Sequence, residues 1–238
     1  MSDTTAYLLA GCRPWNRRTF EQLGATLPGE WHFVGERDEL TAARVRELAP
    51  RYCFFLHWSW KVPAEIVAHE CVAFHMTDLP YGRGGSPLQN LIVRGHRDTM
   101  LSALRMTADF DAGPVYLKRP LSLEGGSAEE LYLRTDRLAA EMIAEIIHTR
   151  PEPQPQTGDP TIFPRRTPDD SRITGDVASL PALHDFIRML DADGYPPAFI
   201  EQAGFRLEFR RSTLRDGRIE ADVTIRSIDD DHRAGDDA

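Results

Sequence analysis

Short apolar runs alternate with helix-forming segments through the first 75 residues, and this alternation constrains the fold more than any other feature. Apolar residues recur at about 3.6-residue spacing between the runs, most clearly in DELTAARVRELA. Continuous apolar strands separated by helices indicate an α/β fold, in which helices flank both faces of a mostly parallel sheet. The expected strands cover residues 6–11, 31–35, 52–57 and 71–75, and the expected helices cover 16–27, 38–49 and 64–70.

The pattern changes in the second half of the chain. Two further strands, joined by the turn ADFDAG, precede a long helix for which Ser127 and Glu130 have the spacing of a capping box. The proline-rich segment PEPQPQTGDP predicts a linker, and a helix with a β-hairpin follows it. We expect a catalytic domain at 1–150, a linker at 151–178, a small helix and β-hairpin unit at 179–230, and a disordered tail at 231–238.

Composition excludes several classes of function. The net charge of −9 gives no general attraction for nucleic-acid phosphates or anionic lipids. The three cysteines fit neither a disulfide framework nor a zinc site, and the sequence contains no GxSxG, CxxC, HExxH or Walker motif. We find no signal-peptide pattern and no run of about 20 apolar residues. We therefore expect a cytoplasmic protein that binds no metal, nucleic acid or membrane.

Polar residues gather where two of the expected strands end. His57 and His75 fall at the carboxyl ends of the third and fourth strands, which is where ligands of parallel sheets bind. His75 is either a satisfied core histidine or a functional residue of the irregular loop that follows it. His57 begins HWSW, which is either one wall of an aromatic pocket or a loop anchor. The turn DFDAGP is structural on its own, but an aspartate beside His75 would orient its imidazole.

A set of spaced residues around His75 resembles a known family. Asp111 follows His75 by 36 residues within DAG. This arrangement resembles the formyltransferases that use 10-formyltetrahydrofolate, which include methionyl-tRNA formyltransferase, glycinamide ribonucleotide formyltransferase and the sugar N-formyltransferases. Segments 163–173 and 185–200 also resemble the region that follows the catalytic domain in methionyl-tRNA formyltransferases. The residues that carry the motif are His75, Pro80, Arg83, Gly84, Pro87 and Asp111.

The resemblance implies a fold, a formyl donor and a set of roles. It implies the Rossmann-like formyltransferase fold, with 10-formyltetrahydrofolate as formyl donor and without a metal. His75 would act as general base or as the cationic donor to the developing oxyanion, and Asp111 would tune it. The pterin would lie at the end of the third strand and around ADFDAG. The candidates for binding it are His57, Trp58, Asp109 and Phe110, with Trp60 beside them.

Two positions depart from the family pattern. The family has an asparagine two residues before the histidine, where it donates a hydrogen bond to the formyl oxygen, and this chain has Ala73 there. Losing one such donor typically costs about 10²- to 10³-fold in rate. Asp78 stands where the family commonly has an aliphatic residue, and it either holds the ammonium group of the acceptor or caps a turn. Candidates for the substrate or oxyanion contacts are Thr77, Asp78, Arg83, Gln89 and Asn90.

The size and charge of the chain direct the choice of acceptor. Methionyl-tRNA formyltransferases are longer and carry a basic C-terminal barrel, whereas sugar N-formyltransferases resemble this chain in size. We therefore expect formylation of a nucleotide-linked amino sugar, with Arg83, Lys118 and Arg119 as phosphate contacts, by a homodimer formed through the C-terminal unit. The alternatives are a formyltransferase for another small amine, a 10-formyltetrahydrofolate hydrolase, and a folate-binding protein whose catalysis is impaired by Ala73.

Overall fold

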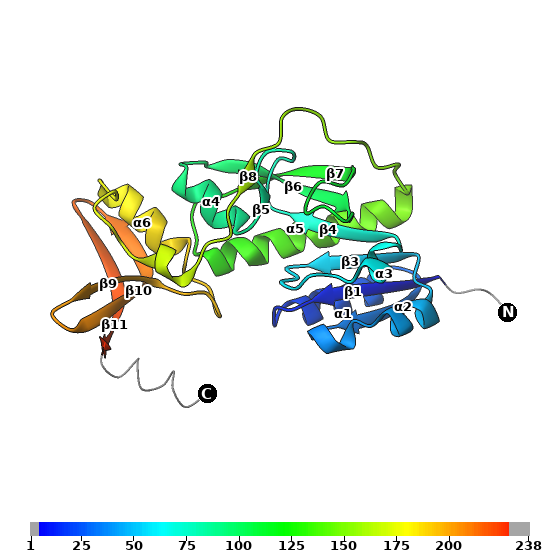
Figure 1. The fold of residues 1–238 in the computed structure, drawn as a ribbon, viewed down its shortest axis with the longest axis horizontal. Helices are drawn as coiled ribbons and strands as arrows, with labels where there is room; N and C mark the ends of the chain where they lie inside the picture. The colour runs from blue at the N-terminus through cyan, green and yellow to red at the C-terminus, as the bar shows by residue number, and fades with distance from the viewer. Residues whose placement is uncertain (1–4, 229–238) are drawn as a thin grey trace. The chain divides into compact units, whose positions relative to one another are not determined.

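The structure is a computed structural model that describes residues 5–228, and the acidic segment 231–238 lies outside the described residues. The chain divides into two compact units (Figure 1). Unit 1 contains the chain up to Pro87 together with Asp98–Ser122 and Leu133–Phe163, so it runs through the proline-rich segment. Unit 2 contains Leu88–Arg97, Leu123–Tyr132 and the chain from Pro164 onward. The division into the expected domains stays a prediction.

Unit 1 is built on a six-stranded sheet in the order β2-β1-β3-β4-β6-β7. The first four strands in this order pair in parallel, and β6 and β7 add antiparallel pairs. The prediction of a mostly parallel α/β sheet is therefore confirmed. The strands are β1 (Ala6–Gly11), β2 (Glu30–Val34), β3 (Tyr52–Leu56), β4 (Cys71–His75), β6 (Asp98–Arg105) and β7 (Val115–Ser122).

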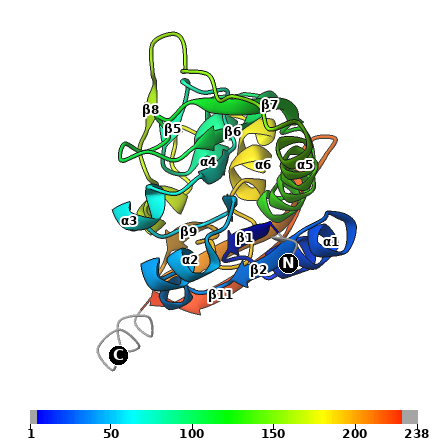
Figure 2. The same cartoon turned by 90° about the vertical axis from the view of Figure 1, so that its right-hand side faces the viewer.

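Helices cover both faces of this sheet because successive side chains of each strand point to opposite faces. Leu8, Cys53 and Cys71 belong to a buried apolar cluster that also contains residues of α2 (Ala42–Leu48) and α3 (Ala64–Val67). Figure 2 shows α2 and α3 on one side of the strands, with α1 (Asn16–Thr26) and α5 (Ala128–Thr149) on the other.

The helix expected at 38–49 is shorter in the structure. It begins at Ala42 because the hydroxyl of Thr41 accepts a hydrogen bond from the Arg44 backbone N–H and caps it. Residues Arg37–Glu39 form a separate 3₁₀ turn. This difference leaves the order of the strands unchanged.

The strand order places a topological switch between β1 and β3. The chain leaves β1 for β2 at one edge of the sheet and leaves β3 for β4 in the opposite direction. Ligands of open α/β sheets bind at the carboxyl ends of the strands near such a point. His57 directly follows β3 and His75 is the last residue of β4, so both lie at this end of the sheet, as expected.

The proline-rich segment packs against unit 1 through backbone hydrogen bonds. Gln154 pairs with Val115, and the Thr161 N–H donates to the Pro80 carbonyl at 3.2 Å. Immediately afterwards β8 (Ile162–Phe163) pairs in parallel with β5 (Arg83–Gly84). These contacts fix the loop that follows β4.

Unit 2 has a three-stranded antiparallel sheet in the order β11-β10-β9 and the helices α4 and α6. The expected hairpin is present, and β9 adds a strand that the sequence analysis did not predict. The capping box of α5 is confirmed, since the Ser127 N–H donates to Glu130 at 2.7 Å and the Glu130 N–H donates to the Ser127 hydroxyl at 3.3 Å. The elements are α4 (Pro87–Val93), α6 (Leu180–Arg188), β9 (Ala198–Gln202), β10 (Phe205–Arg215) and β11 (Arg218–Ser227).

Candidate active site

His75 is held at the end of β4 with one ring nitrogen committed to the backbone. Its Nε2 lies 2.8 Å from the carbonyl oxygen of Gly82, and its side chain is 9% exposed. A carbonyl can only accept, so Nε2 carries the proton of this hydrogen bond. Gly82 has φ +75°, and a Cβ there would lie 2.7 Å from the Phe163 ring, so the turn requires glycine. Nδ1 is therefore the ring nitrogen that is available for proton exchange.

Asp111 brings a carboxylate to that nitrogen from the loop between β6 and β7. Its Oδ1 lies 3.6 Å from His75 Nδ1, and its Oδ2 accepts a hydrogen bond from the Gly84 N–H at 2.9 Å. Asp111 has φ +53°, which is uncommon for a residue other than glycine. The loop and β5 thus fix both the backbone and the carboxylate of Asp111.

Gln156 supports this loop, and the sequence analysis missed it. Its Nε2 donates to the carbonyl oxygens of Asp111 and Gly113 at 2.7 and 2.8 Å. Its Oε1 accepts from the Nε and Nη2 of Arg83 at 3.0 and 2.8 Å. One amide therefore connects Arg83 to the backbone of Asp111. Gln156 lies in the proline-rich segment, where a linker was expected, so no local pattern identified it.

Ala73 lies on the same face of β4 as His75, because side chains alternate along a strand. Ala73 pairs with Phe55 of β3 and Leu104 of β6, and it is partly exposed. Its side chain carries no hydrogen-bond donor. The family asparagine would project from this position, on the histidine face of the strand.

The candidate replacements for that asparagine have other partners. Gln89 donates from Nε2 to the Tyr132 hydroxyl at 2.9 Å and to the Met189 carbonyl at 3.0 Å. Asn90 donates to the Pro164 carbonyl at 2.9 Å, so these contacts lie within unit 2. In unit 1, the buried Thr77 hydroxyl lies 3.4 Å from the Gly82 carbonyl. The role of these residues as oxyanion donors stays a prediction.

The charged candidates near the loop differ in their partners. Asp78 forms an ion pair with Lys118 at 2.6 Å, and Arg119 forms one with Glu145. Arg83 hydrogen-bonds to a neutral amide, so that contact leaves its charge uncompensated. Of the three candidate phosphate contacts, Arg83 has the partner that competes least with a phosphate.

Comparison with known proteins decides the family. A family model described as the C-terminal domain of methionyl-tRNA formyltransferase matches residues 168–226. A solved structure of a methionyl-tRNA formyltransferase from Clostridium thermocellum is 42% identical, with a TM-score of 0.90, over 94% of this chain and 99% of that chain. The chain belongs to the formyltransferase family. The resemblance drawn from His75, Asp111 and their neighbours is thus confirmed at the level of the family.

Other known proteins match less of the chain or at lower identity. The methionyl-tRNA formyltransferase of Thermodesulfovibrio yellowstonii is 28% identical over 58% of this chain and 47% of its own length, so the chain spans about half of that curated relative. HypX from Aquifex aeolicus, solved in complex with tetrahydrofolic acid, is 16% identical with a TM-score of 0.71 over 87% of this chain and 37% of that chain. A sugar N-formyltransferase from Shewanella is 14% identical with a TM-score of 0.68 over 89% and 98%. The last two share the fold.

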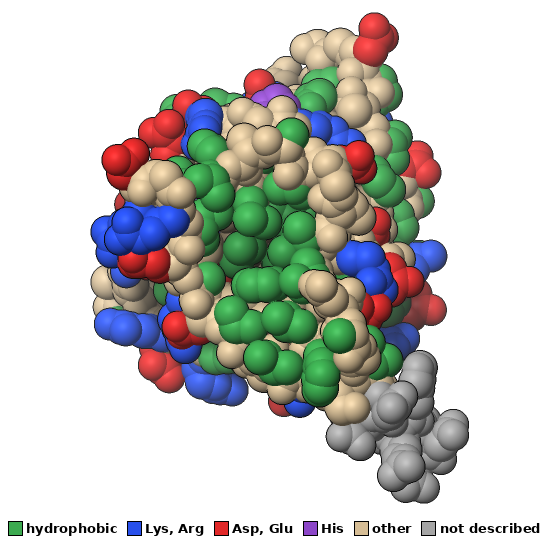
Figure 3. Space-filling view, turned by 90° about the vertical axis from the view of Figure 1, so that its left-hand side faces the viewer, with side chains coloured by type: hydrophobic (Ala, Val, Ile, Leu, Met, Phe, Trp, Pro, Cys, Tyr) green, Lys and Arg blue, Asp and Glu red, His purple; other side chains and the backbone are tan. Residues whose placement is uncertain are grey.

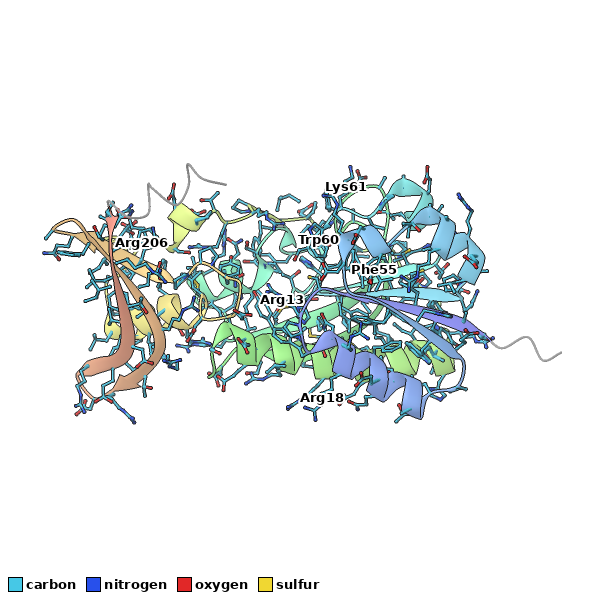
Figure 4. All side chains as sticks on the ribbon, turned by 90° about the horizontal axis from the view of Figure 1, so that it is seen from below. Arg13, Arg18, Phe55, Trp60, Lys61 and Arg206 are labelled. Carbon is cyan, nitrogen blue, oxygen red and sulfur yellow. The ribbon has the colours of Figure 1, made fainter. Side chains whose placement is uncertain are left out.

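The expected pterin contacts of this formyltransferase-family chain lie in two loops. After β3, His57 has φ +50°, and the rings of Trp58 and Trp60 meet edge to face at 4.9 Å. Between β6 and β7, Phe110 is 71% exposed beside Asp111, and the Asp109 carbonyl accepts a hydrogen bond from Thr107. Figure 4 labels Trp60 in the first of these loops. Phe110 therefore presents an exposed aromatic ring, and its contact with a pterin stays a prediction.

A buried polar cluster behind these loops was also missed by the sequence analysis. Asp136 of α5 is 3% exposed and accepts hydrogen bonds from Asn16 Nδ2, at 2.6 Å, and from the Thr19 hydroxyl. Burial raises the pKa of Asp136, and the hydrogen bonds from Thr19 and Asn16 oppose that shift. His57 Nε2 lies 4.0 Å from Asp136 Oδ1, and Asn16 accepts from the Arg13 N–H. The sequence feature that could have identified this cluster is the position of Asp136, a carboxylate on the core-facing side of the long helix α5.

Residues 5–228 contain neither a side-chain cluster that could hold a metal ion nor a helix that could cross a membrane. Among these described residues, no group of three or more His, Cys, Asp or Glu side chains is arranged to hold a metal ion. No described helix has the length and apolar character needed to cross a membrane.

Proposed function

We propose that this protein transfers a formyl group from 10-formyltetrahydrofolate to an amine. The observation that carries the proposal is the pairing of His75 Nδ1 with Asp111 at 3.6 Å, at the carboxyl end of β4, in a chain of the formyltransferase family. A folate donor is supported by HypX, which has the same fold and was solved with tetrahydrofolic acid. The exposed Phe110 beside the pair supports a binding position for the pterin.

In the proposed reaction, His75 moves the proton. The neutral amine attacks the formyl carbon, and Nδ1 of His75 accepts the proton that the amine nitrogen must lose. Asp111 stabilises the resulting imidazolium, whose Nε2–H stays on the Gly82 carbonyl. The bond between the formyl carbon and N10 of the folate then breaks, and the same proton passes from His75 to N10. The products are the formamide and tetrahydrofolate, so atoms and charge balance.

The acceptor that we favour is a small molecule, specifically a nucleotide-linked amino sugar. Within the described chain, every arginine of β10 and β11 is already ion-paired with a carboxylate, which weakens the attraction of this surface for a polyanion. The Shewanella sugar N-formyltransferase shares the fold at nearly the same length. The arginines concerned are Arg206, Arg210, Arg211, Arg215, Arg218 and Arg226.

Methionyl-tRNA is the second candidate acceptor. The relative with 42% identity over nearly its whole length is named a methionyl-tRNA formyltransferase, and this observation favours tRNA. A nucleotide-linked amino sugar and methionyl-tRNA can be supplied separately as acceptors, so a direct assay distinguishes between them.

The test supplies 10-formyltetrahydrofolate with one acceptor at a time and measures tetrahydrofolate and formylated product. We expect product with nucleotide-linked amino sugars and none with methionyl-tRNA. Product with methionyl-tRNA alone would overturn the choice of acceptor and keep the reaction. Formate released without any acceptor would indicate a hydrolase. Folate binding without turnover of any kind would indicate an impaired folate-binding protein, the reading that Ala73 favours.

We also propose that a second copy of the chain covers an exposed apolar face of the C-terminal sheet. Phe205, Val223 and Ile225 lie on one face of β10 and β11 and are 49%, 45% and 62% exposed. Figure 3 shows hydrophobic side chains gathered on this side of the molecule. Apolar patches of this kind commonly mark protein interfaces. We expect a dimer in sedimentation that Ile225→Lys converts to a monomer, and a wild-type monomer at about 10 μM would refute it.

A further inference from the structure

A polar cavity of about 490 Å³ lies entirely within unit 2, and none of the residues discussed above as catalytic lines it. It is lined by the start of α5 around Ser127, by His184 and Arg188 of α6, and by Arg211–Thr213 of β10. Its volume falls within the range of about 300–1,000 Å³ that is usual for small-molecule sites.

Arg188 is a buried lining residue of the cavity, and most of its guanidinium donors have partners. Its side chain is 5% exposed; Nε donates to Asp185 at 2.7 Å, and Nη1 donates to the carbonyls of Leu123 and Gly126 at 3.0 and 3.2 Å. Within the described residues, Nη2 makes no hydrogen bond, and it is not among the nitrogens fully sealed from solvent. Arg188 lines the cavity, and Nη2 is the nitrogen of its guanidinium that these hydrogen bonds leave for a ligand.

Two carboxylates of the cavity wall already accept hydrogen bonds. Asp191 accepts from the Arg211 N–H at 2.7 Å and lies 3.5 Å from Arg210. Glu130 accepts from the Ser127 N–H at 2.7 Å. The wall therefore combines one unused guanidinium nitrogen, Nη2 of Arg188, with carboxylates that already accept hydrogen bonds, and the group that Nη2 lacks is an acceptor.

A bulge in β10 shapes one wall. The register with β11 shifts between Arg210 and Thr213, and Arg211 has φ +49°. The bulge places the Ser212 hydroxyl 2.9 Å from His184 Nδ1. Bulges are enriched beside functional sites because they redirect side chains. Burial, followed by the charge of Arg188, lowers the pKa of His184, so its ring is neutral at pH 7 and serves as a hydrogen-bonding group.

We propose that this cavity binds a phosphate group of a small molecule, through Nη2 of Arg188 with the hydroxyls of Ser212 and Thr213 beside it. A guanidinium and hydroxyl groups are the donors that proteins use for phosphate oxygens. The volume leaves room for a nucleoside attached to that phosphate. None of these residues takes part in the proposed formyl transfer, so the test does not require turnover.

The experiment titrates the full chain with inorganic phosphate, uridine monophosphate and uridine, using calorimetry and phosphorus NMR. We expect saturable binding of at least one of the two phosphate ligands, with a Kd below about 1 mM, and none of uridine. Binding of inorganic phosphate alone would identify a free-anion site, and tighter binding of uridine monophosphate would identify a nucleotide site. Equal binding of uridine, or binding of neither phosphate ligand, would overturn the proposal.

Thr213 provides a matched pair of variants that preserves Arg188. It is exposed and lines the cavity, so Thr213→Glu and Thr213→Gln add side chains of the same size that differ in charge. We expect Thr213→Glu to bind phosphate at least about 10-fold more weakly than Thr213→Gln, with both variants folded. Equal affinities would show that the ligand is bound elsewhere. Arg188→Lys, which keeps the charge and loses the planar fork, is expected to weaken binding similarly.

Discussion

Replacing Asp111 with asparagine tests the proposed role of the carboxylate without removing its structural hydrogen bond. An asparagine Oδ1 still accepts from the Gly84 N–H, so the substitution removes mainly the negative charge 3.6 Å from His75 Nδ1. Two unit charges at that distance interact by about 4 to 5 kcal/mol at an effective dielectric constant of about 20. The imidazolium exists only after His75 has taken the amine proton, so this energy is lost from the transition state and not from the bound substrates.

We therefore expect Asp111→Asn to lower kcat by about 10³-fold while KM for the folate changes by no more than a few-fold. The assay follows conversion of 10-formyltetrahydrofolate to tetrahydrofolate at saturating acceptor. Asp216→Asn, in the exposed hairpin turn of unit 2, is the control and should match the wild type. A loss below about 10-fold in a folded Asp111→Asn protein would refute the electrostatic role assigned to this carboxylate.

Three further predictions address other positions. Ala73→Asn is expected to raise kcat by up to about 10²-fold by adding a donor on the histidine face of β4, and Ala73→Leu, similar in size but without a donor, should not. Gln156→Ala should lower kcat about 10-fold by freeing the Asp111 loop, whereas Gln154→Ala in the same segment should leave it unchanged; equal rates for both would remove Gln156 from the site. The pKa of Asp136 is raised in the folded state, so above about pH 4 the unfolded chain loses this proton more readily than the folded chain does. The wild type therefore loses stability relative to Asp136→Asn as pH rises toward the folded-state pKa, by at most about 1.4 kcal/mol per pH unit. Chemical unfolding of both proteins from pH 4 to 8 checks this. The prediction is contradicted if the unfolding free energy of the wild type minus that of Asp136→Asn stays constant or increases with pH.

Local patterns were enough to predict the elements that carry the site. The apolar runs ending in His57 and His75 predicted β3 and β4 and the end of the sheet at which they lie, because a buried parallel strand has a continuous apolar signature. The Ser127 capping box was likewise visible, since both partners lie within one turn of sequence.

Contacts between distant segments were not predictable in this way. Gln156 joins Asp111 across 45 residues, and β5 pairs with β8 although each has only two residues. Prolines and polar residues in the intervening segment favour a linker by composition, whereas backbone hydrogen bonds and the Gln156 side chain hold it in place in the folded chain. Asp136 was hidden for a related reason, because its partners belong to a helix more than a hundred residues earlier.

The hydrogen bond from His75 Nε2 to the Gly82 carbonyl limits how His75 can compensate for the asparagine that Ala73 replaces. It leaves one ring nitrogen, Nδ1, to serve both the amine proton and the formyl oxygen. A single nitrogen can serve both in sequence: neutral Nδ1 accepts the proton as the amine attacks, and the N–H so formed becomes a donor at the moment negative charge develops on the oxygen. Asp111 strengthens the second role by stabilising that N–H as an imidazolium. The formyl oxygen would then have two donors in the family pattern, the asparagine and the protonated Nδ1 of His75, and Ala73 leaves only the second. Ala73→Asn should therefore accelerate the reaction only while His75 and Asp111 are both intact. A rate gain from Ala73→Asn that persists in the Asp111→Asn background would contradict this.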